Sequence, residues 1–388
     1  MYSTRKLLLL LALLLPAAVA QAAVVQDFYR VELPVAEGQP RDEVMREALE
    51  VMLARLGGGD VLSEHGGFDA ALKDPRSLMQ RMGSSDDGGI DVEFEPAQLR
   101  DLMSAAGRPM LGPTRPGVML WAVEQSALGD EFLASGGAWA ETLNQAARHR
   151  AVALSFPLND LQDRAEVSEA VIVSADQATL VEATERYEAT AALALYITEQ
   201  SSGWKLDWHL YLDGEADKGS VSAETPEQAA DELMQQVANE VFEQYAVPAA
   251  QSGDLDNWTI VVDNVEGLNA FAGLQRILQQ LGSQVAPQLL AINGSQVRLK
   301  FDFSGSEAQL VRLLALDQRL IKSEPPAPEP APEPVAPQTP ASLDAPLGAE
   351  PLEQQPLGVE PDAVDSPAAD VPAPAAEPAP NTLYFRWR

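Results

Sequence analysis

The sequence predicts an α/β (α+β) fold, with a layered α/β body followed by a disordered tail rich in Pro, Ala and Glu. Two observations support this prediction. As far as residue 321, stretches in which apolar residues alternate take turns with stretches in which they recur at helical spacing. Beyond that point, 17 of the chain's 29 prolines lie between residues 324 and 380. Such a segment cannot bury enough apolar surface to offset the entropy of ordering it.

The first 22 residues are expected to be a signal peptide. Two basic residues precede an apolar run from Leu7 to Leu15, and Ala20-Gln21-Ala22 offers a cleavage site. The run is short for a membrane span, and an uncleaved anchor is the alternative. The sequence has no Cys, so the chain can form no disulfide and cannot be a bacterial lipoprotein, which carries an acylated Cys. We therefore expect a periplasmic protein with no stable membrane span once the signal peptide is removed.

Residues 23–110 are predicted to form an N-terminal β-α module. Partial alternation around Val31 and Leu33 favours a strand. The stretch RDEVMREALEVMLARLGGG then places its apolar residues on one helical face and ends in three glycines that stop the helix. We expect a short helix in PRSLMQRM, a strand from Ile90 to Phe94, and a helix from Pro96 to Ala106.

Residues 111–250 are predicted to form an α/β middle domain. The segment from Val118 to Val123 is apolar without interruption, which is typical of a strand buried on both faces. The alternation of elements then continues with a helix at 139–149, a strand at 151–158, an acidic turn in NDLQDRAEVSEA, a helix at 176–188, two strands around Ser201-Ser202-Gly203, and a long helix that begins at Thr225-Pro226.

Residues 256–321 show the order strand, helix, strand, strand, helix. The stretch VAPQLLAINGSQVRLKFDF predicts a hairpin, because an Asn-Gly pair flanked by alternating apolar residues is a strong hairpin signal. This βαββα order predicts a ferredoxin-like unit. Residues 322–380 are then expected to be a disordered, acidic, Pro-rich linker, followed by an aromatic and basic C-terminal motif at 381–388.

Charge and motif content argue against several classes of function. The formal net charge of −32 disfavours nucleic-acid binding, because phosphate binding is driven mainly by Lys and Arg, and it disfavours adsorption to anionic lipid. The sequence contains no G-x-S-x-G, P-loop, G-x-G-x-x-G or H-E-x-x-H motif. Its three histidines, His65, His149 and His209, have no carboxylate at a ligand-like spacing. We expect no cofactor.

One acidic loop partly fits a calcium-binding frame. In DGEADKGSVSAE, the side chains of Asp213, Glu215, Asp217 and Glu224 occupy positions 1, 3, 5 and 12 of that frame. Position 6 is Lys218, where the frame requires Gly, and the loop follows a predicted strand instead of a helix. The favoured interpretation is an acidic surface loop, and a calcium site is the alternative.

A second acidic stretch, PLNDLQDR, follows a predicted buried strand. Ligands often bind at the carboxyl ends of strands in open α/β sheets, so Asp160 and Asp163 form a candidate ligand-binding pair. The favoured alternative is that Asp160 caps the turn or helix that follows.

The chain ends in NTLYFRWR after a segment without any Lys or Arg from Ser323 to Phe385. Aromatic and Arg side chains are common anchors of protein interfaces. Partner docking by the motif, most simply as a strand added to the edge of a partner's sheet, would use Leu383, Tyr384, Phe385, Arg386, Trp387 and Arg388. The motif can also fold back onto its own domain as a short strand, and a terminus without a role is the third possibility.

Four stretches carry a resemblance to a known family: REALEVMLARLGG, VEFEPAQLRDLMSAAGRPMLGPTRPGVMLWAVE, AVALSFPLNDLQD and RYEATAALALYITEQSSGWKLDWHLYLDG. They lie within residues 23–250 and resemble the bacterial exported family named domain of unknown function 2066. The resemblance implies a protein of the gammaproteobacterial envelope. It implies no activity, because none is assigned to that family.

Three classes of function remain. The sequence favours a non-catalytic periplasmic binding or adaptor protein that contacts other envelope proteins, on the basis of the export signal, the missing catalytic motifs and the long spacer before the C-terminal motif. An envelope hydrolase without a recognisable motif is the first alternative, and a pocket of convergent polar groups near Asp160 would support it. A small-ligand sensor is the second alternative.

Overall fold

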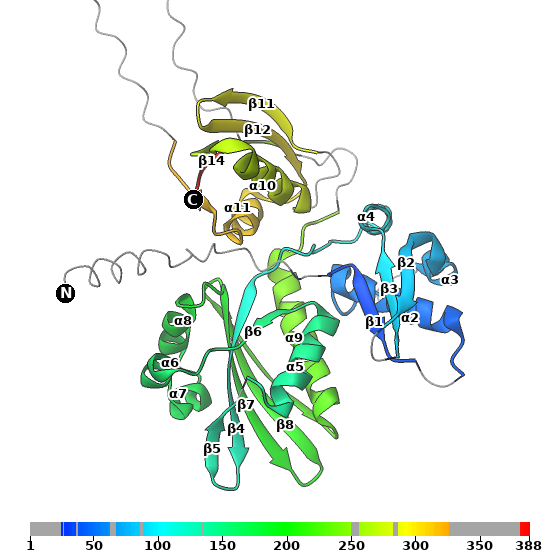
Figure 1. Cartoon of the computed structure of the whole chain (residues 1–388), viewed down its shortest axis with the longest axis vertical. Helices are drawn as coiled ribbons and strands as arrows, with labels where there is room; N and C mark the ends of the chain where they lie inside the picture. The colour runs from blue at the N-terminus through cyan, green and yellow to red at the C-terminus, as the bar shows by residue number, and fades with distance from the viewer. Residues whose placement is uncertain are drawn as a thin grey trace, which may run out of the picture. The chain divides into compact units, whose positions relative to one another are not determined.

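The computed structural model describes residues 25, 27–35, 38–62, 67–85, 88–133, 135–249, 256–281, 286–325 and 381–388. The predicted signal peptide and nearly all of the predicted linker lie outside the described residues. Within the described residues, the chain has the predicted α+β architecture, in which helices are layered against three β-sheets (Figure 1). None of the described helices is both long enough and apolar enough to cross a membrane.

The N-terminal sheet consists of three antiparallel strands in the order β1-β3-β2. Its elements are β1 (Arg30–Leu33), α2 (Arg41–Gly57), α3 (Asp69–Lys73), η1 (Pro75–Leu78), β2 (Met79–Ser84), β3 (Ile90–Phe94) and α4 (Pro96–Ala105). The apolar face of α2 packs against the sheet, as its spacing predicts. The predicted helix in PRSLMQRM is reduced to the single 3-10 turn η1, because Met79 already begins the strand β2 that pairs with β3.

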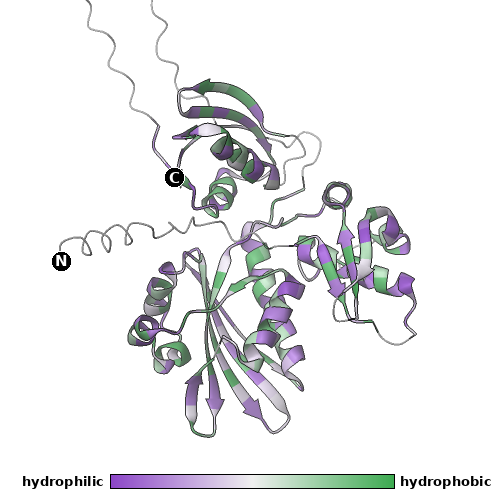
Figure 2. Ribbon diagram, viewed as in Figure 1, coloured by the Kyte–Doolittle hydropathy of each residue, from purple (hydrophilic) through white to green (hydrophobic). Residues whose placement is uncertain are grey.

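The middle sheet has the strand order β5-β4-β7-β8-β9, and β6 pairs with β4. Its strands are β4 (Gly117–Ser126), β5 (Gly129–Phe132), β6 (Ala153–Ser155), β7 (Ala191–Gln200), β8 (Gly203–Leu212) and β9 (Glu215–Ala223). Strand β4 is parallel to β6 and β7, whereas β4–β5, β7–β8 and β8–β9 are antiparallel pairs. Hydrophobic colour dominates the strands between the helices in Figure 2, and hydrophilic colour the hairpin ends.

Helices cover both faces of the middle sheet (Figure 1). One face carries α5 (Ala138–Arg150) and α9 (Pro226–Tyr245), and the other carries α6 (Leu161–Glu166), α7 (Glu169–Ser174) and α8 (Gln177–Glu185). The prediction that β4 is buried on both faces is confirmed, because Leu120 packs with α5 and α9 while Trp121 packs with α7 and α8. The predicted acidic turn is wrong, since Asp160 and Ser168 cap the two short helices α6 and α7 within it.

The third unit, residues 256–322 with 382–387, contains the predicted βαββα order. Its elements are β10 (Asp256–Asp263), α10 (Gly267–Gln280), β11 (Gln288–Asn293), β12 (Gln296–Phe303), α11 (Glu307–Ala315), β13 (Leu320–Lys322) and β14 (Thr382–Trp387). The strand order is β11-β12-β10-β14-β13. The sheet therefore has two strands beyond the predicted set, and one of them comes from the end of the chain.

The C-terminal motif supplies an internal strand of this sheet. Strand β14 runs parallel to β10 on one side and antiparallel to β13 on the other. Leu383, Phe385 and Trp387 are buried in the core, while Tyr384 and Arg386 belong to the opposite face of the strand. The fold-back interpretation is therefore confirmed. The docking interpretation is wrong for this structure, because the apolar side chains that a partner would bind are already packed inside the third unit.

We expect Phe385→Ala to lower the free energy of unfolding by about 3–5 kcal/mol, because it removes a fully buried aromatic side chain and leaves a cavity. Phe385 is 1% exposed. The matched control is Tyr384→Ala, one residue away on the other face, where a half-buried ring should cost at most about 1.5 kcal/mol. Urea unfolding followed by Trp fluorescence measures both losses. Equal losses in the two variants would contradict the register of β14.

Candidate functional site

Asp160, the first residue of the predicted ligand-binding pair, has a structural role. It is the N-cap of α6, and its carboxylate accepts hydrogen bonds from the backbone N–H groups of Gln162 and Asp163, both at 3.0 Å. The same carboxylate pairs with the guanidinium of Arg186 at 2.6 Å. The capping alternative for Asp160 is confirmed.

Asp163 lies deeper, and its side chain is only 2% exposed. It accepts hydrogen bonds from Arg186 at 2.7 Å and from the hydroxyl of Tyr187 at 2.5 Å. The hydrogen bond from Arg186 lowers the pKa of Asp160 below its ordinary value. Burial and the bond to Asp163 raise the pKa of Tyr187 to about 12. Asp160 is therefore ionised and Tyr187 neutral near pH 7, and neither is poised to transfer a proton there.

The acidic stretch that suggested a calcium loop is a β-hairpin and its second strand. Asp213 and Gly214 form the turn, both with positive φ, and residues 215–223 form β9. An extended strand rises about 3.3 Å per residue, so Glu224 lies far from Asp213 and the two cannot share an ion. Asp213 binds the hydroxyl of Tyr245 and the guanidinium of Arg312, each at 2.9 Å.

The calcium interpretation is therefore wrong. Of its remaining residues, Glu215 accepts a hydrogen bond from Gln244 at 3.3 Å, and Asp217 is paired with Leu210 across the β8–β9 ladder. In the part of the chain that the structure describes, no group of three or more His, Asp or Glu side chains is arranged to hold a metal ion.

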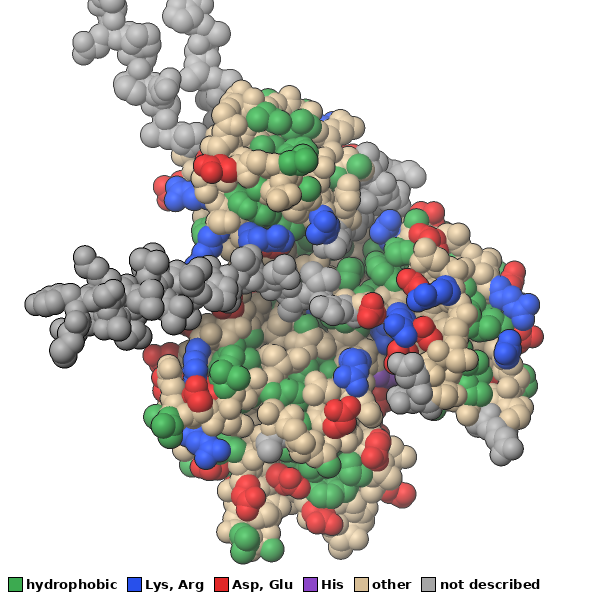
Figure 3. All heavy atoms as spheres, in the orientation of Figure 1, with side chains coloured by type: hydrophobic (Ala, Val, Ile, Leu, Met, Phe, Trp, Pro, Cys, Tyr) green, Lys and Arg blue, Asp and Glu red, His purple; other side chains and the backbone are tan. Residues whose placement is uncertain are grey.

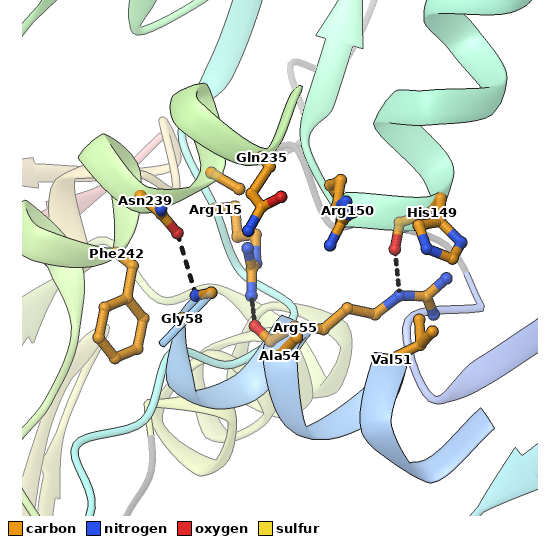
Figure 4. A pocket seen from close by; sticks show the side chains of 12 residues that line it. Val51, Ala54, Arg55, Gly58, Arg115, His149, Arg150, Gln235, Asn239 and Phe242 are labelled. Atoms are coloured by element: carbon orange, nitrogen blue, oxygen red, sulfur yellow. Dashed lines mark hydrogen bonds between the residues drawn. The ribbon is translucent and has the colours of Figure 1, made fainter. Parts of the chain in front are cut away.

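A small pocket lies where α2 meets α5 and α9 (Figure 4). Arg55, Arg115 and Arg150 contribute to its lining, together with polar side chains of α9 that include Asn239. The side-chain oxygen of Asn239 accepts a hydrogen bond from the backbone N–H of Gly59 at 3.0 Å. The cavity measures about 20 Å³, which is room for about one water molecule.

Arg55 reaches from α2 to the end of α5. Its guanidinium donates to the carbonyl oxygens of Arg148 and His149, both at 2.9 Å, and to those of Phe28 and Arg30 at 3.0 and 2.7 Å. A cation at the last turn of α5 complements the negative end of the helix dipole. Burial lowers the pKa of Arg55 to about 10, so the group keeps its charge at neutral pH.

Arg115 is buried behind Arg55. Its guanidinium donates to the carbonyl oxygens of Arg55, Leu111 and Gly112. Burial, followed by repulsion from Arg55, lowers the pKa of Arg115 to about 9. Backbone carbonyl oxygens thus provide the hydrogen bonds that make these two buried charges tolerable.

The third arginine of the pocket, Arg150, forms a two-point ion pair with Asp231 of α9 at 2.8 and 2.5 Å. Burial also lowers the pKa of the neighbouring His149, so its ring is neutral at pH 7. The guanidinium groups are engaged and the space is small. We therefore interpret this pocket as a structural joint that fixes α2 against α5 and α9.

An apolar edge strand is the feature of the structure that most resembles a binding surface. Strand β11 ends the third sheet, and among the described residues it pairs only with β12. Leu289, Leu290 and Ile292 are 47%, 51% and 55% exposed. Figure 3 shows hydrophobic side chains gathered over this part of the third unit. The sequence QLLAIN has no charged residue and no Pro, which are the residues that usually guard sheet edges.

The sequence analysis did not single out Arg55, Arg115 or Arg186. For Arg55 a local signal exists, because this residue stands three positions after Met52 on the buried stripe of α2. A charge on an apolar stripe indicates a buried, hydrogen-bonded group. For Arg115 and Arg186, we find no comparable signal in the neighbouring sequence.

Comparison with known proteins gives a match in the N-terminal module. A family model described as a domain of unknown function (DUF8605) matches residues 22–112, less than a third of the chain. In that segment the chain is similar to this family, whose description carries no activity. No curated protein and no solved structure matches the chain. The resemblance to domain of unknown function 2066 stays a prediction.

We expect Arg186→Gln to raise the pKa of Asp160 toward its ordinary value of 3.8, because the hydrogen bond from Arg186 is the largest cause of the depression. A depressed carboxylate pKa stabilises the fold above pH 4 or so and loses this effect as pH falls through the folded-state pKa. Variant and wild type should therefore differ in unfolding free energy at pH 7 and converge in acid. Carbon NMR of the carboxyl group measures the pKa, with Lys205→Gln as the remote control. An unchanged titration of Asp160 would sink this account.

We expect Arg55→Lys to lower the free energy of unfolding by about 2–4 kcal/mol, because one ammonium cannot serve four carbonyl oxygens and leaves buried acceptors without donors. Arg46→Lys on the exposed side of the same helix is the control and should be nearly neutral. Urea unfolding gives the size of the loss. Limited proteolysis should show faster cutting between the N-terminal module and the middle domain. Equal stability of the two variants would rule out the joint.

Proposed function

We propose that this protein is a non-catalytic adaptor of the bacterial envelope that works by binding other envelope proteins. The observation that carries the proposal is the exposed, uncharged edge strand β11, with Leu289, Leu290 and Ile292 about half exposed. An edge strand presents unpaired backbone N–H and C=O groups, and an extended segment of a partner can add to it as a further strand.

The fate of the predicted polar residues agrees with a role without catalysis. Asp160 and Asp163 are held by Arg186, and Asp213 is held by Arg312 and Tyr245. The hydrolase and the ligand sensor that the sequence left open both need a pocket with convergent, available polar groups. The polar pocket described above is lined by guanidinium groups that are already engaged, so the adaptor is the function that we propose.

The cellular location is part of the proposal and rests on the sequence. Residues 1–22 have the pattern of a cleaved signal peptide without a lipoprotein Cys, which favours the periplasm. The net charge of −32 favours protein partners over nucleic acid. The partner class is therefore an envelope protein that offers an extended apolar segment.

A photo-crosslinking amino acid at position 290 tests the proposal in intact cells. We expect an adduct with an envelope protein, identified by mass spectrometry, that disappears when Ile292→Lys places a charge on the same edge. The control carries the crosslinker at Leu128, a hairpin residue that is 93% exposed and lies in another sheet. The same adducts from both positions, or an adduct with a second copy of this chain alone, would contradict the adaptor proposal.

A further inference from the structure

The last strand of the third sheet occupies a complete slot between two other strands. On one side β14 is in register with β10, from Thr259 opposite Thr382 to Asp263 opposite Arg386. On the other side it pairs with β13, where Leu320 lies opposite Trp387. We call this position between β10 and β13 the β14 slot. Both walls of the slot belong to the body of the third unit.

The slot is shaped for Trp387. Gly273 of α10 faces the indole ring, and a Cβ atom added at Gly273 would lie only 3.1 Å from it. The guanidinium of Arg319 lies over the same ring, 5.0 Å from its centroid. Arg319 is fixed in turn by two hydrogen bonds to the buried Asp317, at 2.9 and 2.6 Å. Body residues that do not depend on β14 therefore hold the Arg319 wall in place.

Body residues also bind the main chain of the segment at both of its ends. The N–H of Thr259 donates to the carbonyl oxygen of Asn381 at 2.9 Å. At the other end, the side-chain amide of Asn264 donates to the carbonyl oxygen of Trp387 at 3.0 Å. The N–H of Arg388 donates to the carbonyl oxygen of Arg319 at 2.9 Å. This is the pattern of peptide recognition by strand addition, in which main-chain bonds give affinity and alternate side chains give specificity.

The connection to the segment is far longer than the geometry requires. Strands β13 and β14 are antiparallel neighbours, and a loop of two to five residues joins such a pair in most hairpins. Here residues 325–380, 56 in all, separate the two strands. Loop closure becomes less favourable as about the 3/2 power of length, so the long connection lowers the effective concentration of the segment at its slot roughly 50-fold relative to a four-residue loop.

We propose that the β14 slot is a peptide-binding site. Its ligand is an extended peptide with large apolar side chains at three alternating positions, the last of them Trp, and the chain's own residues 381–388 are the resident occupant. The same segment supplied as a separate peptide binds in place of the resident one. This site is distinct from the β11 edge and does not rest on the adaptor proposal.

The test starts from the folded full-length chain. A protease site is placed at residue 350, and the purified protein is cut there, so that the C-terminal fragment is held in the slot without a covalent link. A fluorescent peptide NTLYFRWR is then added, and its uptake is followed by fluorescence anisotropy. We expect the cut protein to bind the peptide at least tenfold more tightly than the uncut protein, because cutting removes the tethered competitor.

Matched peptides test the chemistry of the slot. A peptide with Leu383, Phe385 and Trp387 changed to Ser should not bind, whereas one with Tyr384→Ser, on the other face, should bind like the original. In the body, Gly273→Val should weaken binding of the original peptide by crowding the indole, and a peptide with Trp387→Leu should recover it.

Three results would overturn the proposal. The first is no uptake of the labelled peptide by the cut protein, whether its old fragment stays or leaves. The second is equal uptake of the triple-Ser peptide, which would mean that alternate apolar side chains are not recognised. The third is equal loss of both peptides in the Gly273→Val variant, which would mean that the glycine does not form the Trp387 site.

Discussion

The third sheet depends on a strand that the chain supplies last. Strand β10 lies inside the sheet, and its backbone groups need partners on both sides. Strand β12 provides one side and β14 the other. Leu383, Phe385 and Trp387 bring their side chains into the same core as Ile260 and Val262 of β10. The end of the chain is therefore a structural part of the third unit, and the unit reaches its complete form only after residues 325–380 have been crossed.

Local patterns in the sequence were sufficient for the long elements. The apolar stripe of α2, the Pro and Thr at the start of α9, and the uninterrupted apolar run of β4 each predicted the element that the structure shows. The failures have physical causes. Helices α6 and α7 are only six residues each, too short for a helical period to be visible, and their Asp and Ser caps also suit turns. Strand β9 carries mostly polar side chains, so its alternation is weak.

Non-local contacts set the other limit on prediction. The motif NTLYFRWR has the composition of an interface anchor, and that composition is equally suited to a strand in the chain's own core. Only the partners of the segment separate the two outcomes, and these lie more than a hundred residues away in β10. The same is true of Arg55, whose acceptors include carbonyl oxygens at Arg148 and His149. Asp160 was the favourable case, because a cap is defined by the next three residues.

The two ends of the third sheet differ in a way that bears on function. At one end β13 is short and carries Lys322, which agrees with the usual protection of a sheet edge. At the other end β11 is longer, uncharged, and exposes Leu289, Leu290 and Ile292. A register shift between Leu289 and Ala291 interrupts its pairing with β12 but leaves the end near Ile292 regular. Selection against aggregation should remove such an edge unless something binds it. The contrast between the two ends is therefore better explained by a partner for β11 than by chance exposure.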